Sequence, residues 1–130
     1  GTIVGTIVSI GTILLLTTLF DIPELLKVSL VPKSVTTAIA LEMSNLLGGE
    51  PSITIMGVLF TGFTGILLGP AMITALRIKD PVVIGLSFGI SSHVIGTAKA
   101  CEYGNKEGAM SGIAIFFTGI MTVIVALIIF

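Results

Sequence analysis

The chain has 130 residues, of which 54% are hydrophobic and 10% are charged, with a net charge of -1 and a mean hydropathy of +1.18. Soluble domains are about one quarter charged, so this composition excludes an ordinary water-soluble domain and indicates an integral membrane protein. The six Lys and Arg residues are spread over the loops and form no basic surface, which excludes nucleic acid as a partner.

Uncharged stretches divide the chain into candidate membrane segments. Residues 1–20, 52–76, 82–98 and 108–130 contain no Asp, Glu, Lys or Arg. An apolar helix of about 20 residues crosses a hydrocarbon core about 30 Å thick. The sequence therefore predicts an all-α integral membrane protein, a polytopic helical bundle.

The segment after the first span is too short to cross the membrane as a regular helix. Charge and proline after Phe20 end that span, and a short linker helix is expected over 25–31. Pro32 and Lys33 then precede the segment from Ser34 to Leu47, which ends at a Gly-Gly pair. As a helix this segment is about 21 Å long. It is interpreted as a half-helix or a re-entrant element.

The second half of the chain combines two regular spans with another interrupted segment. Residues 52–78 are long enough for one crossing, with a kink or break expected near the end at Gly69-Pro70. Residues 82–98 are rich in Gly and Ser and contain the only histidine, His93. Residues 108–130 form the last span. Two interrupted or re-entrant helices are thus expected within the bundle.

Basic residues in the loops predict an orientation. If every segment crosses once, alternate loops carry four and two basic residues. The positive-inside rule then places the richer group in the cytoplasm, residue 1 outside and residue 130 inside. The four are Lys27, Lys33, Arg77 and Lys79, and the two are Lys99 and Lys106.

An internal repeat underlies this layout. Thr37-Ala38-Ile39-Ala40-Leu41-Glu42 recurs in similar form as Thr97-Ala98-Lys99-Ala100-Cys101-Glu102, and Phe60-Thr61-Gly62 recurs at nearly the same offset as Phe117-Thr118-Gly119. We predict a single membrane domain over 1–130, the C-terminal portion of a larger domain, with repeat units at about 32–76 and 91–130. Inverted and parallel repeats both fit this spacing.

Both repeat copies place hydroxyl residues and one basic side chain at an expected helix break, supplied by Pro32 in one copy and by Gly89 and Gly96 in the other. Paired interrupted segments are typical of transporter sites. If the hydroxyls cap half-helices, free N–H groups and positive dipole ends favour an anion such as a carboxylate. Alternatively, these Ser and Thr residues bond to helix carbonyls or permit close packing. The candidate substrate-binding residues are Lys33, Ser34, Thr36, Thr37, Ser91, Ser92, His93, Gly96 and Thr97.

His93 stands out because its pKa is ordinarily near neutral and it lies in an uncharged membrane segment. We expect it to contact substrate or a proton; the alternative is a neutral imidazole bonded to a helix carbonyl. The chain has no nucleophile motif, metal-ligand spacing or phosphate loop, and its single cysteine excludes an internal disulfide. We therefore expect no enzymatic activity, no metal site and no cofactor.

Ordered motifs over residues 31 to 120 resemble the LrgB/CidB family, which includes the plastid glycolate/glycerate translocator. The chain departs from the family pattern at Ala38, Glu50 and Val94, where Pro, an apolar residue and Gly are usual. The motifs are Val31-Pro32-Lys33-Ser34-Val35-Thr36-Thr37, Gly48-Gly49-Glu50-Pro51, Leu68-Gly69-Pro70, Arg77-Ile78-Lys79-Asp80-Pro81 and Ser92-His93-Val94-Ile95-Gly96-Thr97-Ala98.

The resemblance implies a multi-pass protein of the bacterial inner membrane. We favour a secondary carrier of small monocarboxylates such as pyruvate or glycolate. The family also implies an alternative, an antiholin-like regulator of murein hydrolase export and cell lysis that acts with an LrgA/CidA-like holin-like membrane protein. A purely structural membrane subunit is the third reading. Besides these partners the protein would contact membrane lipid, and a homo-oligomer is left open, since Gly-x-x-x-Gly pairs such as Gly85/Gly89 and Gly108/Gly112 permit close helix packing.

Overall fold

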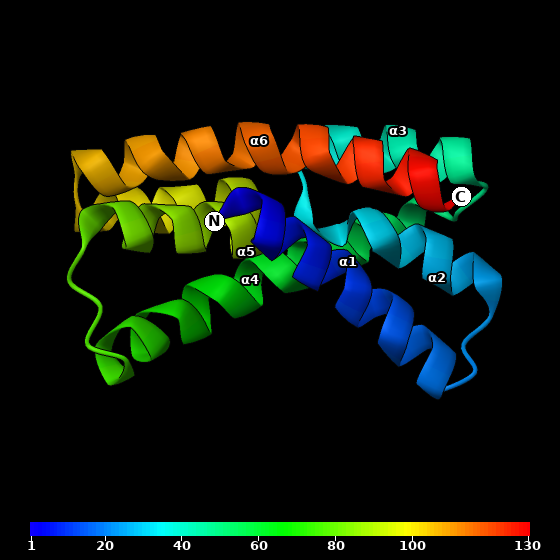
Figure 1. Cartoon of the computed structure of the whole chain (residues 1–130), viewed down its shortest axis with the longest axis horizontal. Helices are drawn as coiled ribbons and strands as arrows, with labels where there is room; N and C mark the ends of the chain where they lie inside the picture. Colours follow the sequence, from blue (N-terminus) through cyan, green and yellow to red (C-terminus); the bar gives the residue numbers. More distant parts are fainter.

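The computed structural model describes residues 1–130, and all of its regular structure is helical. Three continuous helices form its frame: α1 (Thr2–Leu19), α4 (Pro51–Ala75) and α6 (Asn105–Ile129) (Figure 1). All three are long and apolar enough to cross a membrane. The predicted all-α membrane bundle is confirmed. Of the kink or break expected at Gly69-Pro70, the break is wrong, because α4 continues through Pro70 to Ala75.

The segment between α1 and α4 folds back on itself as a hairpin of helices, the first hairpin (residues 24–47). It consists of α2 (Glu24–Leu30), the short 3-10 helix η1 (Val31–Ser34) and α3 (Thr37–Leu47). The Ser29 carbonyl and the Ser44 hydroxyl both bond to the Thr54 hydroxyl, at 2.9 and 2.7 Å. One continuous helix would separate these serines by about 22 Å. The chain therefore reverses between them.

The reversal of the first hairpin follows from its sequence. Pro32 has no N–H to donate, and its φ and ψ of -83° and 15° leave the helical region. Val35 is extended, and α3 starts afresh after Thr36. The predicted re-entrant element is confirmed, although its helix begins at Thr37 rather than at Ser34.

Residues 81–103, labelled α5 (Pro81–Tyr103), form the second hairpin. The Phe88 and Tyr103 rings lie 5.7 Å apart, whereas a straight helix would separate these residues by about 22 Å. The reversal occurs at His93, whose φ and ψ are 43° and -132°. The breaks expected at Gly89 and Gly96 are thus misplaced. Both glycines are helical and serve packing, since a Cβ there would overlap a backbone carbonyl, of Ser111 and Phe88 respectively.

The tips of the two hairpins meet on consecutive residues of α4. Gly57 lies against Lys33 of the first tip, and the Val58 carbonyl is 3.0 Å from His93 Nε2 of the second. The hairpins reach this level from opposite ends of the molecule (Figure 1). Their arrangement is therefore inverted, which answers the question of direction that the repeat spacing left open.

The predicted grouping of basic residues is wrong, because each hairpin returns to the side from which it enters. The Lys27 ammonium lies over the Phe130 ring, 5.7 Å from its centroid, at one end of the molecule. Arg77 and Lys79 lie in the loop between α4 and α5, at the other end of the molecule (Figure 1). The helix α6 begins at this same end, and Lys106 belongs to its first turn. The positive-inside rule now assigns this second end to the cytoplasm and Phe130 to the outside.

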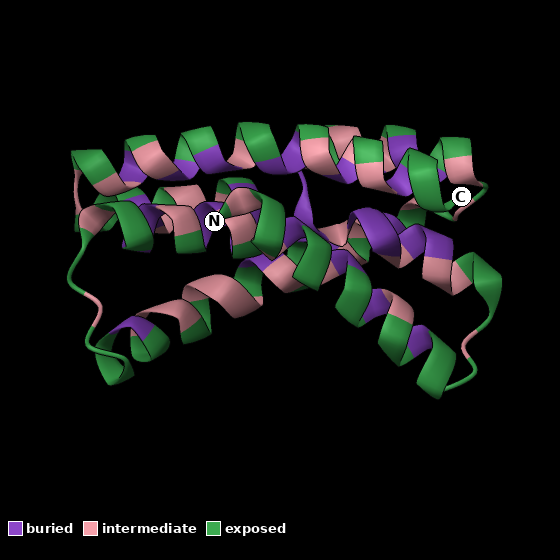
Figure 2. Cartoon of the chain, in the orientation of Figure 1, coloured by how far each residue is buried: buried purple, intermediate pink, exposed green.

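Exposed residues cover the outward faces of α1, α4 and α6, whereas buried residues line the faces turned toward the hairpins (Figure 2). The exposed side chains include large apolar ones such as Val8, Phe63 and Leu127. In water such a surface would be unfavourable, but in a bilayer it contacts lipid or neighbouring membrane helices.

Candidate functional site

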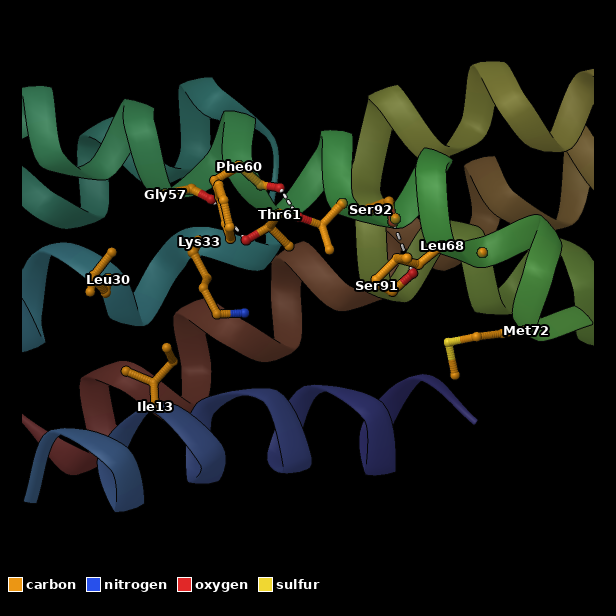
Figure 3. A pocket seen from close by; sticks show the side chains of 13 residues that line it. Ile13, Leu30, Lys33, Gly57, Phe60, Thr61, Leu68, Met72, Ser91 and Ser92 are labelled. Atoms are coloured by element: carbon orange, nitrogen blue, oxygen red, sulfur yellow. Dashed lines mark hydrogen bonds between the residues drawn. The ribbon is translucent and has the colours of Figure 1, made fainter. Parts of the chain in front are cut away.

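A cavity of about 530 Å³ lies where the two tips meet α4. Residues from both hairpins line it, together with α4 and one residue of α1 (Figure 3). The lining is Ile13, Leu30, Lys33, Gly57, Phe60, Thr61, Thr64, Gly65, Leu68, Gly69, Met72, Ser91 and Ser92. The fold therefore joins segments that are far apart in the sequence around one space.

Lys33 is the one charged residue in the lining of this cavity. Its ammonium extends from the first tip into the space (Figure 3) and donates to Ser34 Oγ at 3.1 Å. No carboxylate pairs with it, because the two ion pairs of the chain are Lys27–Glu24 and Lys99–Glu102. An unpaired ammonium inside a membrane protein is unfavourable unless an anion compensates it, so the position is suited to an anionic ligand.

Hydroxyl groups also line the cavity. Ser91 Oγ and Ser92 Oγ bond to each other at 3.0 Å on the second hairpin. On α4, Thr61 and Thr64 each donate to the carbonyl four residues earlier, at 2.8 and 2.7 Å. A hydroxyl can redirect its proton to a ligand when one binds. The cavity thus offers hydrogen-bond donors as well as a positive charge.

Small residues of α4 allow the tips to come this close. A Cβ at Gly65 would overlap the Ser92 hydroxyl, and one at Gly57 would lie 2.9 Å from a Leu30 methyl group. A Cβ at Gly69 would lie 2.6 Å from the Phe88 ring. The glycines therefore let α4 pass both tips at backbone distance.

Each tip also carries the N-terminus of the helix that follows it. Thr36 is the N-cap of α3 but makes no side-chain cap hydrogen bond, and the second arm of the second hairpin starts after His93. Helix N-termini carry free N–H groups and partial positive charge. The two inverted hairpins bring both N-termini into the middle of the protein. The hydroxyl caps expected there are not formed, because Ser91 and Thr97 bond to the carbonyls four residues earlier, which was the alternative.

A buried hydroxyl network fixes the base of the first hairpin. The Thr54 hydroxyl contacts Ser29 and Ser44 as described above, and the Ser29 hydroxyl accepts a hydrogen bond from the Glu50 N–H at 2.7 Å. The tip has a further link, Ser34 Oγ to Ser9 Oγ of α1 at 2.8 Å. These bonds hold Lys33 in register with α4.

Of the predicted binding residues, the structure places Lys33, Ser91 and Ser92 in the cavity lining. Ser34 lies behind Lys33, and Thr36 and Thr37 precede or begin α3 outside the lining, with Thr37 exposed. The remaining three belong to the second hairpin: His93 bonds the Val58 carbonyl, Gly96 packs against Phe88, and Thr97 Oγ1 bonds Ser111 Oγ at 2.7 Å.

Sequence reasoning did not select Thr61 or Thr64. Thr61 belongs to the repeated Phe-Thr-Gly motif, which by itself indicates only duplication. Its recurrence beside a helix-packing glycine was the available indication of a site on α4.

The fold and the cavity define a multi-pass membrane protein in which two inverted re-entrant hairpins frame a mainly apolar cavity that contains one ammonium and several hydroxyl groups. A family model for the LrgB-like family matches residues 1–130. The chain therefore belongs to the LrgB-like family of membrane proteins. No solved structure matches the chain.

Bacterial proteins are among its relatives. The chain is 36% identical over 121 residues to the uncharacterized protein YxaC of Bacillus subtilis (strain 168), covering 93% of this chain and 53% of that protein. It is 34% identical over 123 residues to the antiholin-like proteins LrgB of Bacillus mycoides (strain KBAB4) and Bacillus cereus (strain B4264), covering 95% of this chain and 54% of each. The chain thus spans about half the length of these relatives, and a multi-pass bacterial membrane protein is the class they share.

Proposed function

We propose that this chain forms the binding core of a secondary carrier for small monocarboxylates such as pyruvate or glycolate. The observation that carries the proposal is the unpaired Lys33 ammonium in a cavity that no carboxylate residue lines. A monocarboxylate would neutralise that single charge. Its oxygens would accept hydrogen bonds from Lys33 and from the hydroxyls of Ser91, Ser92 and Thr61.

The size and lining of the cavity support a small ligand. About 530 Å³ holds a carboxylate of a few carbons together with several waters, each of which occupies about 30 Å³. The apolar side chains of Ile13, Leu30 and Met72 would face the carbon end of the ligand. Inverted, discontinuous helices around such a site are the arrangement through which secondary carriers achieve alternating access.

Uptake by the full-length protein in proteoliposomes tests the proposal. We expect saturable uptake of labelled pyruvate or glycolate. Lys33→Gln should lower kcat/KM at least tenfold, because it removes the charge that pairs with the carboxylate. Lys79→Gln is the matched control, since it removes the same charge from an exposed loop outside the cavity. Equal uptake by Lys33→Gln and wild type would reject Lys33 as the anion ligand.

Two further variants test predicted residues that lie outside the cavity lining. His93→Ala and Thr97→Val are both expected to depress uptake by loosening the second hairpin. His93 bonds this hairpin to α4, and Thr97 bonds it to α6. Undiminished uptake in both variants would remove these residues from the functional site.

A second function, an antiholin-like one, is favoured by the name of the LrgB relatives. The family resemblance implies that it would regulate murein hydrolase export and lysis with a holin-like partner. It requires a free helix face, which Gly112 offers on α6 because no atom lies within 4 Å of an added Cβ. Gly85 is buried against α6 and is unsuited to this test. If regulation is the function, Gly112→Leu should alter lysis, and the protein alone should carry no carboxylate flux.

A further inference from the structure

Thr118 on α6 carries an unexplained polar group. It is 1% exposed, and its Oγ1 is the one buried side-chain nitrogen or oxygen in the chain without a hydrogen-bond partner. Threonines of α4, such as Thr61, Thr64 and Thr74, donate to the carbonyl four residues earlier. A buried hydroxyl without any partner is unfavourable and calls for a reason.

The neighbours of Thr118 place it between the two hairpins. Ala114, one turn before it, packs against Gly89 of the second hairpin, and Gly119 packs against Ile39 of the first. Further along α6, Ala126 joins the apolar cluster that contains Val31 and Met43 of the first hairpin. The Thr118 hydroxyl therefore lies at the level of the tips, on the α6 side.

Thr61 holds the corresponding place on α4. Gly57, one turn before it, packs against the first hairpin, and Gly65, one turn after it, packs against the second. Along α6 the order is reversed, because Ala114 contacts the second hairpin and Gly119, later in the helix, contacts the first. Thr61 and Thr118 also occupy the same position in the repeated Phe-Thr-Gly motif. Thr61 and Thr118 are therefore equivalent positions of the two inverted repeats. The Thr61 hydroxyl lines the cavity, whereas the Thr118 hydroxyl is buried and has no hydrogen-bond partner.

We propose that Thr118 is a second anion-contacting hydroxyl, the α6 counterpart of Thr61, which lines the site when the carrier opens to the other side of the membrane. In carriers built from inverted repeats, one repeat rocks against the other around a site at their interface. Because the two hairpins here are related by inversion, the opposite-facing state would give each repeat the environment that the other has in this structure. In that state Thr118 gains the carboxylate as its partner, and Thr61 becomes the buried hydroxyl. This inference rests on the proposed carrier function.

Cysteine labelling of the full-length protein tests this pairing. In a Cys101→Ser background, Thr61→Cys and Thr118→Cys are exposed in oriented vesicles to sulfonatoethyl methanethiosulfonate, an anionic, membrane-impermeant thiol reagent. We expect the two cysteines to react from opposite sides of the membrane, and pyruvate or glycolate to slow both reactions severalfold. Thr12→Cys is the control. Thr12 lies on an outer face of α1 that contacts lipid or neighbouring membrane helices, so an anionic reagent in water should leave this cysteine unlabelled.

The outcomes separate this inference from the proposed function. Thr118→Cys that reacts from neither side, or from the same side as Thr61→Cys, overturns the pairing. Opposite-sided reaction that no carboxylate slows supports the pairing and rejects the carboxylate. Thr118→Val provides a second test: it removes only an unpartnered hydroxyl, so the melting temperature should hold or rise while uptake falls at least tenfold. Wild-type uptake by this variant overturns the role of Thr118.

Discussion

His93 Nε2 lies 3.0 Å from the Val58 carbonyl, and this hydrogen bond ties the tip of the second hairpin to α4. The same residue has a φ of 43°, a conformation that glycine adopts without strain and residues with a Cβ disfavour. One side chain thus supplies both an attachment and a strained turn. Strain at a ligand-framing turn persists only where the surrounding contacts enforce it.

Two substitutions at His93 separate these effects. His93→Ala loses the bond to Val58 and keeps the strain, so we expect a loss of about 1–3 kcal/mol in unfolding free energy. His93→Gly loses the same bond but relieves the turn, and it should be about 1 kcal/mol more stable than the Ala variant. Thermal unfolding in detergent measures both. Equal melting temperatures would show that the turn stores no strain.

Gly65→Ala is expected to displace the second hairpin from α4, because the added methyl group overlaps the Ser92 hydroxyl. Overpacking of this kind costs about 1–3 kcal/mol. Gly112→Ala is the matched control, since open space surrounds Gly112 and alanine favours a helix by up to about 1 kcal/mol. Melting temperatures should fall for the first and hold or rise for the second. The opposite ranking contradicts the tip contact.

Thr54→Val should destabilise the first hairpin. The change leaves the Ser29 carbonyl and the Ser44 hydroxyl without their shared partner in a buried site, at a cost of about 1–3 kcal/mol. Thr12→Val makes the same chemical change where the hydroxyl is exposed and has one local bond, so its effect should be within about 0.5 kcal/mol. Denaturation in mild detergent compares the two. Similar losses of unfolding free energy for both variants would show that the Thr54 network adds no more stability than one local hydrogen bond.

Lys27 and Lys79 are expected to face opposite sides of the membrane, since they lie at opposite ends of the molecule. In a Cys101→Ser background of the full-length protein, Lys79→Cys should react with an impermeant thiol reagent from the cytoplasmic side and Lys27→Cys from the outside. Labelling of intact cells against inverted vesicles distinguishes them. Reaction of both from one side would require that a hairpin cross the membrane.

Hydropathy predicted most of the fold, because charge-free stretches of membrane length are recorded directly in the sequence. The first hairpin was predictable because Pro32 marks a break and because the 34–47 segment is too short to cross. The second turn was misplaced for a physical reason. Gly89 and Gly96 are the residues most permissive of a break, but here they provide contact surfaces, and the strained conformation falls on His93 instead.

The site was predictable only where chemistry and helix breaks coincide. Lys33, Ser91 and Ser92 lie beside the turns, so the repeat indicated them. Thr61 and Thr64 lie inside a regular helix, where threonine usually bonds its own backbone. They line the cavity only because two distant tips dock on that face of α4. Contacts of this kind depend on the direction of each hairpin, which spacing alone left undecided.

The reversal at His93 affects how the protein is assembled during synthesis. As a linear segment, Pro81–Tyr103 is long and apolar enough to be inserted as a single transmembrane helix, which would leave α6 pointing the wrong way. Gly85 and Gly89 pack against the start of α6, which the ribosome makes later. The topology of this part of the nascent chain is therefore fixed only once α6 has been synthesised.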